Sequence, residues 1–209
     1  MTQRFWWTLA HFFCTTIVHI VTTTVPYPRL DPDALKVLAH PLRSRLLGEL
    51  RLNGPATATT LADVLGTNTG ATSYHLRKLA SVGLVEETGE GKGRERWWRP
   101  SHEMHSWFSS DVSEDPDGIA AAEWLHGESL RRFQVFAEEW FASEWDWPVE
   151  WRDAAGSSDY LLELSADQLK ELVEELTSVI ERYRKVESGP NPARVIFCTF
   201  AFPQPDGRI

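Results

Sequence analysis

The chain of 209 residues has few cysteines and lacks the short motifs of common enzyme classes. Cys14 and Cys198 are its only cysteines, and two thiols so far apart in sequence do not make the disulfide framework of a small secreted protein. We therefore expect a reducing, cytoplasmic location. The sequence contains no glycine-rich phosphate loop, G-x-S-x-G, H-E-x-x-H or paired-cysteine motif. It also contains no internal repeat, and we expect neither enzymatic activity nor a cofactor.

Charge is distributed unevenly along the chain, whose net charge is −9. Residues 31–100 carry ten Lys and Arg against eight Asp and Glu, whereas residues 101–209 carry nine against twenty-two. Residues 1–30 contain two arginines and no acid. A weakly basic segment joined to a strongly acidic one is consistent with phosphate contact at one end and repulsion of DNA at the other. Ordinary solvated acidic helices would give the same distribution.

Residues 5–25 form an uncharged run about as long as a membrane span. His11, His19 and six threonines dilute its hydrophobicity, and histidine is costly in hydrocarbon. A secretory signal fits poorly, because Arg4 alone supplies the basic start and no small-residue cleavage site follows. Residues 1–30 are thus an apolar extension with three interpretations: an extra helix or strand on the body, a non-native upstream extension of the reading frame, or a membrane insertion. The membrane interpretation fits least.

Residues 57–98 follow the pattern of a short helix, a tight turn, a second helix and a glycine-tipped β-hairpin. The apolar positions of the first helix are Leu61, Val64 and Leu65. Gly66 is expected to end it, at a position that needs a left-handed residue. The second helix starts near Asn68, and its buried face is predicted to be Ala71, Leu76 and Leu79.

The opposite face of the second helix carries small polar, aromatic and basic side chains and no acid: Asn68, Thr69, Ser73, Tyr74, Arg77 and Lys78. A helix with such a face can enter the major groove. We expect Asn68, Thr69 and Ser73 to meet base edges or nearby phosphates. Tyr74, Arg77 and Lys78 would hold the phosphate backbone, each cation neutralising about one phosphate.

Two further helices are predicted upstream, and a hairpin downstream. Asp31-Pro32 and Pro41 are helix starts, Asn53-Gly54-Pro55 is a turn, and Thr57 is a plausible N-cap. In the hairpin, residues 84–88 and 94–99 are the strands. The cations of this hairpin are Lys92, Arg94 and Arg96. They could reach the minor groove, although a solvated hairpin is an alternative. Trp97 and Trp98 should alternate, so that one packs on the body.

The run SYHLRKLASVGLV (residues 73–85), followed by GKGRERWW, resembles the ArsR/SmtB-type winged helix-turn-helix regulators. Residues 35–66 are similar to the first helices of the same family. The equivalents of its helix-breaking proline and arginine are Ala39, His40, Pro41 and Arg43. His75 matches the histidine of the family's S-x-H-L run and could either pack between helices or contact DNA. Thr72, where relatives usually have valine, would be core.

The resemblance covers residues 31–100, about a third of the chain, and implies a winged helix-turn-helix DNA-binding domain there. One such module reads few base pairs, so a homodimer on a two-fold site in double-stranded promoter DNA is expected. The chain would then be a transcriptional regulator, with a repressor as the first expectation and an unidentified small-molecule effector. The alternative is a winged helix that docks another protein without binding DNA.

Family members often sense metals through a cysteine pair, and the equivalent positions are Thr57 and Thr59. Hydroxyls are poor ligands for soft metals, so thiolate sensing is disfavoured. A second family site uses histidines on the helix after the wing. His102 and His105 would share a helix face and are weak zinc candidates. Two solvated histidines are the simpler interpretation, and we expect no metal.

Residues 101–209 are acidic and rich in tryptophan, and we expect dimerisation and ligand binding there. Six of the ten tryptophans lie between positions 107 and 151. The candidates to line an apolar ligand pocket are Trp124, Trp140, Trp145, Trp147 and Trp151. Ordinary core packing is the default interpretation of such a cluster.

A strand–helix–strand unit is predicted at the end of the chain. Its strands are residues 159–164 and the nearly all-apolar residues 194–202, which should be buried on both faces. Between them, Ser165 and Gln168 form a capping box before a helix with an apolar stripe suited to coiled-coil-like pairing. The predicted fold class is mainly α with β (α+β): a winged helix-turn-helix followed by a helical region with this small unit.

Overall fold

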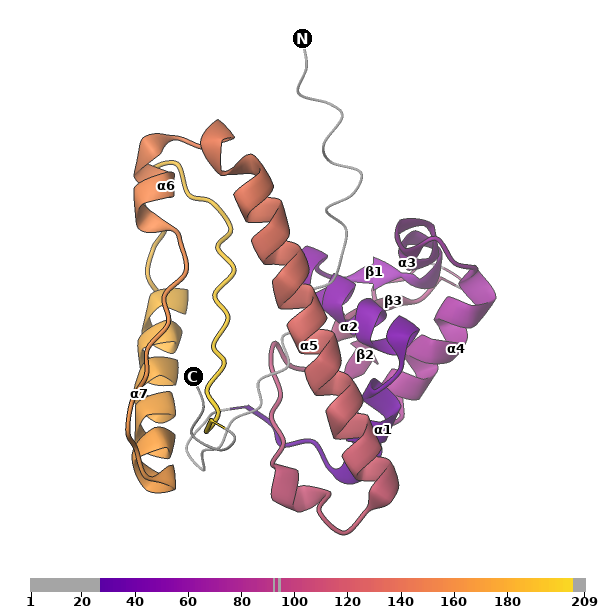
Figure 1. The fold of residues 1–209 in the computed structure, drawn as a ribbon. Helices are drawn as coiled ribbons and strands as arrows, with labels where there is room; N and C mark the ends of the chain where they lie inside the picture. Colours follow the sequence, from indigo (N-terminus) through magenta and orange to yellow (C-terminus); the bar gives the residue numbers. More distant parts are fainter. Residues whose placement is uncertain (1–26, 92, 94, 205–209) are drawn as a thin grey trace.

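A computed structural model describes residues 27–91, 93 and 95–204 (Figure 1). The expectations for residues 5–25, and those for Lys92 and Arg94, lie outside the described residues. The described chain is mainly helical with one three-stranded sheet, which confirms the predicted α+β class. In this part of the chain no helix is long and apolar enough to cross a membrane.

Proline begins each of the first two helices, as predicted. In α1 (Pro32–Leu38) the Asp31 carboxylate accepts a hydrogen bond from the Ala34 N–H and so satisfies one of the exposed donors of the first turn. Helix α2 (Pro41–Asn53) ends at Gly54, whose φ of 86° suits glycine and terminates the helix.

The helix-turn-helix consists of α3 (Ala58–Leu65) and α4 (Thr69–Ala80). The Thr57 hydroxyl caps α3 by accepting from the Thr60 N–H, and Gly66 ends it in the left-handed conformation with φ 62°. The Asn68 side chain caps α4. The Thr57 cap, the end of α3 at Gly66 and the start of the second helix near Asn68 were predicted and are confirmed, whereas the capping contact of Asn68 comes from the structure. Val64, expected in the core, is 39% exposed instead.

The sheet contains one strand more than the predicted hairpin. Strands β2 (Val85–Glu87) and β3 (Trp97–Pro100) form the wing, and β1 (Ala56–Thr57) pairs with the other edge of β3, giving the antiparallel order β1-β3-β2. A two-residue strand has no detectable period of its own, so β1 could not be seen in the sequence. Trp98 is buried and Trp97 half-buried, which confirms the predicted alternation.

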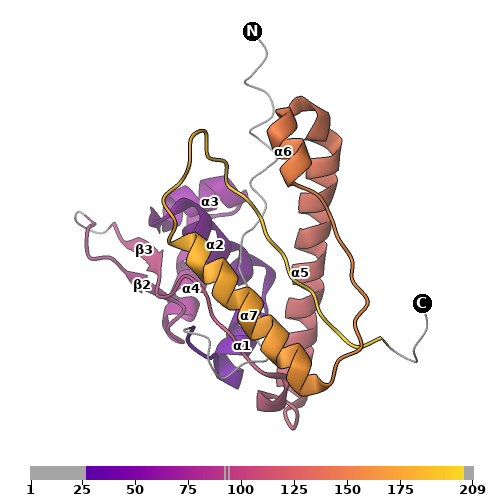
Figure 2. The same cartoon turned by 90° about the vertical axis from the view of Figure 1, so that its left-hand side faces the viewer.

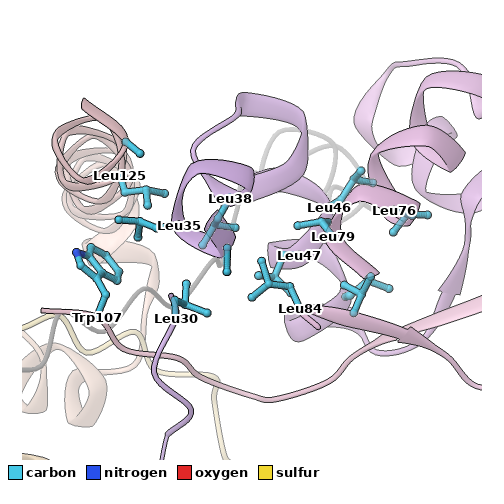
Figure 3. Close-up of a cluster of buried hydrophobic side chains, with 14 of the residues drawn as sticks. Leu30, Leu35, Leu38, Leu46, Leu47, Leu76, Leu79, Leu84, Trp107 and Leu125 are labelled. Atoms are coloured by element: carbon cyan, nitrogen blue, oxygen red, sulfur yellow. The ribbon is translucent and has the colours of Figure 1, made fainter. Parts of the chain in front are cut away.

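One continuous leucine core joins the winged helix to the next helix (Figure 3). Leu46, Leu76 and Leu79 pack at the helix-turn-helix, while Trp107 and Leu125 lie on the other side of Leu35. Thr72 is fully buried, as expected for a position that favours valine. The core therefore ties α4 to elements both before and after it.

After the wing come η1 (Ser109–Asp111) and the long helix α5 (Pro116–Ser143), which packs on α1. Short η2 (Glu144–Asp146) and α6 (Val149–Ala154) follow, and α6 lies beside the C-terminal end of α5 in Figures 1 and 2. The last helix, α7 (Ala166–Arg184), begins with the predicted Ser165–Gln168 capping box.

The predicted strand–helix–strand unit is wrong. Residues 159–164 and 194–202 have no strand assignment and pair with no strand among the described residues. Their apolar side chains are largely exposed rather than buried; Phe197, for example, is 69% exposed. A hydrophobic run favours burial and an extended backbone, but a strand also needs a neighbouring edge to hydrogen-bond with, and the local pattern carries no information about that edge.

The turn between α3 and α4 gives a first testable prediction. Gly66→Ala should lower the free energy of unfolding by about 1 kcal/mol, because a Cβ is disfavoured at a left-handed residue. Gly127→Ala is the matched control inside α5, where the added Cβ would meet only the Arg131 side chain at 3.4 Å. That change should stabilise the protein by about 0.5–1 kcal/mol. Equal effects of the two substitutions in urea unfolding would contradict this account of the turn.

Candidate nucleic-acid interface

Helix α4 presents its predicted reading residues on one accessible face. Asn68, Thr69, Arg77 and Lys78 are exposed, and Tyr74 is 50% exposed. Ser73 is half-buried on the same helix. Thr72, Leu76 and Leu79 lie in the core, whereas Ala71, predicted to be buried, is half-buried. The fold thus leaves the predicted DNA-contacting side chains of α4 accessible to solvent.

The start of α4 is suited to an anion. The Asn68 side-chain oxygen accepts from the Ala71 N–H at 2.8 Å, and the helix has no acid in its first turn. The positive end of a helix dipole and its remaining N–H groups favour a phosphate at such a position. Asn68 therefore has a structural role as a cap in addition to any contact with DNA.

The cations at the end of α4 are available for phosphates. Within the described part of the chain, neither Arg77 nor Lys78 forms an ion pair. The Lys78 ammonium lies 6.0 Å from the centre of the Tyr74 ring, so the two side chains share one side of the helix. Both charges can approach a polyanion without first breaking a salt bridge.

His75 occupies a helix-packing position. Its half-buried ring lies 4.5 Å, centre to centre, from that of His40, the N-cap of α2, and the Tyr74 ring meets it edge-on at 5.1 Å. Burial, together with the positive charge of Arg43, lowers the pKa of His75. Because the neutral His75 imidazole packs between α4 and the start of α2, the packing interpretation is favoured over direct contact with DNA.

On the wing, cross-strand ion pairs occupy the described arginines. Arg96 contacts Glu87 at 2.5 Å, and Arg99 contacts Glu86 at 2.7 Å. Exposed pairs of this kind contribute little to stability, so a phosphate could replace Glu87 as the partner of Arg96 at small cost. The two other predicted wing cations lie outside the described residues.

The expectation for His102 and His105 is wrong in two respects. Neither residue lies on a helix, and only His102 is solvent-exposed, whereas His105 is 1% exposed. Arg51 of α2 contacts both residues: its Nη2 lies 2.7 Å from His105 Nδ1, and it also donates to the His102 carbonyl oxygen. The described residues contain no group of three or more His, Cys, Asp or Glu side chains that could hold a metal.

The buried His105 makes stability depend on pH. Burial first, and then the charge of Arg51, lowers its pKa well below the ordinary 6.5. The unfolded chain therefore binds more protons than the folded chain below pH 6.5, and stability falls as the pH is lowered from that value. Between pH 7.5 and 5.5 this single group should lower the free energy of unfolding by about 1 kcal/mol.

Urea unfolding of His105→Gln at the two pH values checks this prediction. The substitution should flatten the pH dependence of the free energy of unfolding by about that amount. An undiminished pH dependence in His105→Gln would show that the buried imidazole is not its source.

The tryptophan cluster lies at the junction of α5, η2 and α6. Trp147 stands 5.9 Å from both Trp140 and Trp151, between ring centres, and Trp145 is 79% exposed beneath the Arg152 guanidinium. Trp124 is half-buried against the leucine core instead. The five predicted pocket residues are therefore split between two places, and a shared pocket for them stays a prediction.

The buried aromatic contact that the sequence did not reveal is Trp107. Its ring is 1% exposed and stacks on His126 at 5.6 Å, with His105 at 6.5 Å on the same cluster. The only sign of this contact in the sequence is that Trp107 belongs to the tryptophan-rich segment. Trp107 anchors the segment after the wing to α5 and so fixes the position of His105.

Comparison with known proteins points to one family. A sequence model described as a helix-turn-helix domain matches residues 38–88. The HTH-type transcriptional regulator NmtR of Mycobacterium tuberculosis is 43% identical over 62 residues, which are 30% of this chain and 49% of that protein. The chain thus matches about half the length of this curated relative.

Two solved structures are also similar in sequence. One is the homodimeric winged helix-turn-helix DNA-binding domain of a possible ArsR-family regulator from Mycobacterium bovis, with 30% identity, 34% of this chain and 63% of that chain covered, and a TM-score of 0.30. The other is titled a possible transcriptional regulator for arsenical resistance, with 31% identity, 49% of this chain and 94% of that chain covered, and the same TM-score. On sequence identity, the chain belongs to the ArsR-type family of winged helix-turn-helix transcriptional regulators.

Proposed function

We propose that the protein is a cytoplasmic transcriptional repressor that binds double-stranded promoter DNA as a homodimer. The observation that carries the proposal is the acid-free, accessible face of α4, with Arg77 and Lys78 in no ion pair among the described residues. Side chains at the start of α4 meet base edges, and the cations near its end neutralise phosphates. The wing, through Arg96, adds a contact in the neighbouring groove.

Two copies are needed for affinity and specificity, because one reading helix covers few base pairs. The relative from M. bovis is a homodimer. Residues 101–209 would supply the dimer contacts: the second half of α5 leaves Leu130 and Phe141 more than half exposed, and α7 buries none of its residues. Apolar helical faces of this kind are commonly covered by a second subunit.

The effector would be sensed without thiolates. The hydroxyl of Thr57 is engaged as the cap of α3, where it accepts from the Thr60 N–H. Thr59 is an exposed alcohol on the same helix. Hydroxyl groups at these two positions give a soft metal no suitable ligand, so an effector must act elsewhere on the protein.

Sequencing of genomic DNA fragments enriched by the purified full-length protein tests the proposal. The expected result is a motif with two inverted half-sites whose centres are about one helical turn apart. Enrichment of no motif, together with capture of a protein partner through α4, would favour the alternative of a winged helix that docks protein. A motif that lacks two inverted half-sites would reject the homodimer arrangement.

A further inference from the structure

The apolar core ends in the first half of α5. In the part of the chain that the structure describes, no apolar side chain beyond Leu125 is buried. Of the large apolar side chains left exposed, only Val64, Tyr74 and Ile119 come before residue 130, and the other twenty follow it. Soluble monomers rarely expose apolar patches larger than a few hundred Å², and larger patches mark interaction sites.

The extended segment of residues 194–202 is the least covered part of this surface. Figures 1 and 2 show no strand beside it. Phe200 contacts Phe133 of α5, with 5.3 Å between the ring centres, but Phe197 is 69% exposed. Residues 195–197 and 199–202 form no backbone hydrogen bond with another described residue. An extended chain with open N–H and C=O groups is a template for pairing with a second strand.

The composition of the segment limits which partner can cover it. Residues 195–203 carry no charge, so neither a nucleic acid nor a charged peptide gains an ion pair there. A suitable partner must be apolar and must offer a strand edge of its own. A second copy of this chain offers both, because a two-fold axis places the same surface opposite itself. This step rests on the homodimer of the proposed function.

The exposed area is sufficient for a stable dimer. Phe197, Phe200 and Phe202 are 69%, 45% and 75% exposed. Together they leave roughly 300–450 Å² accessible, since an aromatic side chain offers about 150–250 Å². A standard interface buries about 800 Å² on each partner. Leu161 and Leu162, in the extended run after α6, are both more than half exposed and are available for the remainder.

We propose that residues 194–202 of two copies lie antiparallel across the two-fold axis and form an inter-subunit, two-stranded sheet. The segment is a strand only in the dimer, where the second copy supplies the edge that one chain lacks. Successive side chains of a strand point to opposite faces. Phe200 therefore keeps one face on α5, and Phe197 lies on the other face, beside its cross-strand neighbours from the second copy.

The charge around the interface predicts how salt acts on the dimer. Residues 101–209 of each copy hold twenty-two acidic and nine basic residues, so two copies repel each other at low salt. Salt screens this repulsion, because the screening length falls from about 10 Å at 0.1 M to about 3 Å at 1 M. The dimer should therefore tighten at least threefold between these concentrations. A dimer that weakens with salt would contradict an uncharged interface.

Sedimentation velocity on the full-length protein without DNA measures the dimer. Phe197→Asp should raise the Kd of dimerisation at least thirtyfold, because it buries a charge in an apolar sheet. Since Phe197 is largely exposed within one chain, the substitution leaves the fold of that chain intact. Val64→Asp on α3, another exposed apolar position, is the control and should change the Kd less than threefold. An unchanged Kd in Phe197→Asp would overturn the proposal.

Hydrogen exchange tests the strand pairing itself. The amides of residues 194–202 should exchange at least tenfold more slowly at protein concentrations above the Kd of dimerisation than well below it. Phe197→Asp should lose this protection. Rapid exchange in the dimer would overturn the inter-subunit strand. Protection that does not depend on concentration would mean that the same chain covers the segment, for example through residues 1–26, and would also overturn the proposal.

The same measurements separate this interface from the proposed function. A dimer that depends on Phe197 in a protein that enriches no DNA would reject the proposed function and leave the interface standing. A dimer that persists in Phe197→Asp and binds two inverted half-sites would reject the interface and leave the function standing. A wild type that stays monomeric at every concentration would reject both the interface and the homodimer.

Discussion

Replacing Arg77 and Lys78 together by glutamine should lower the affinity for the enriched DNA at least about a hundredfold at physiological salt. Both side chains are exposed on α4 and form no ion pair within the described residues, so their charge is free to neutralise phosphates. A homodimer loses four such cations at once. Anisotropy titration of labelled DNA measures the loss.

The matched control removes the same charge far from the reading helix. Arg182→Gln with Lys185→Gln changes two exposed cations at the end of α7. If contact with phosphates is local, this control should change the affinity less than about threefold, through long-range electrostatics alone. A comparable loss in both double variants would mean that net charge, rather than α4, controls binding.

Leu76→Ala should lower the free energy of unfolding by about 2–5 kcal/mol. Leu76 is fully buried in the middle of α4 and belongs to the continuous leucine core, so its removal leaves a cavity beneath the reading face (Figure 3). Urea unfolding followed by circular dichroism measures the change. Tyr74→Ala, two positions earlier on the exposed face of the same helix, is the control.

The two substitutions should affect different properties, Leu76→Ala the stability and Tyr74→Ala the DNA affinity. Tyr74→Ala is expected to stay within about 0.5 kcal/mol of the wild type in stability, but to weaken DNA binding. Leu76→Ala should lower stability while the DNA affinity of the remaining folded protein is retained. A small stability effect of Leu76→Ala would contradict the assignment of the two faces of α4.

The features predicted correctly are set by short-range chemistry. Asp31 and Thr57 each cap a helix with their own side chain, and Gly66 ends one through its own backbone freedom. Such interactions span three or four residues, so the sequence pattern contains both partners. The exposed face of α4 was predictable for the same reason, because helical periodicity alone places Leu76 and Arg77 on different faces.

The features that were missed depend on partners distant in sequence. Arg51 contacts His105 from 54 positions away, and no local pattern around either residue indicates the contact. Strand β1 exists only because Trp98 of β3 lies opposite Ala56. The strand predicted at residues 194–202 is an error of the opposite kind. The apolar pattern is strong, but no strand edge lies beside it among the described residues.

The predicted tryptophan pocket also depends on distant partners. Trp124 lies against the leucine core, whereas Trp140, Trp145, Trp147 and Trp151 lie at the junction of α5, η2 and α6. Composition alone does not indicate which of these tryptophans pack together.

The salt dependence of DNA binding tests the central claim most directly. The logarithm of the association constant for the enriched DNA is measured against the logarithm of the salt concentration. With at least Arg77 and Lys78 of two subunits on phosphates, the slope should be about −4 or steeper, and Arg77→Gln with Lys78→Gln should make it shallower by about that amount. A slope near zero, or a slope unaffected by the double substitution, would contradict the claim that α4 binds the DNA backbone.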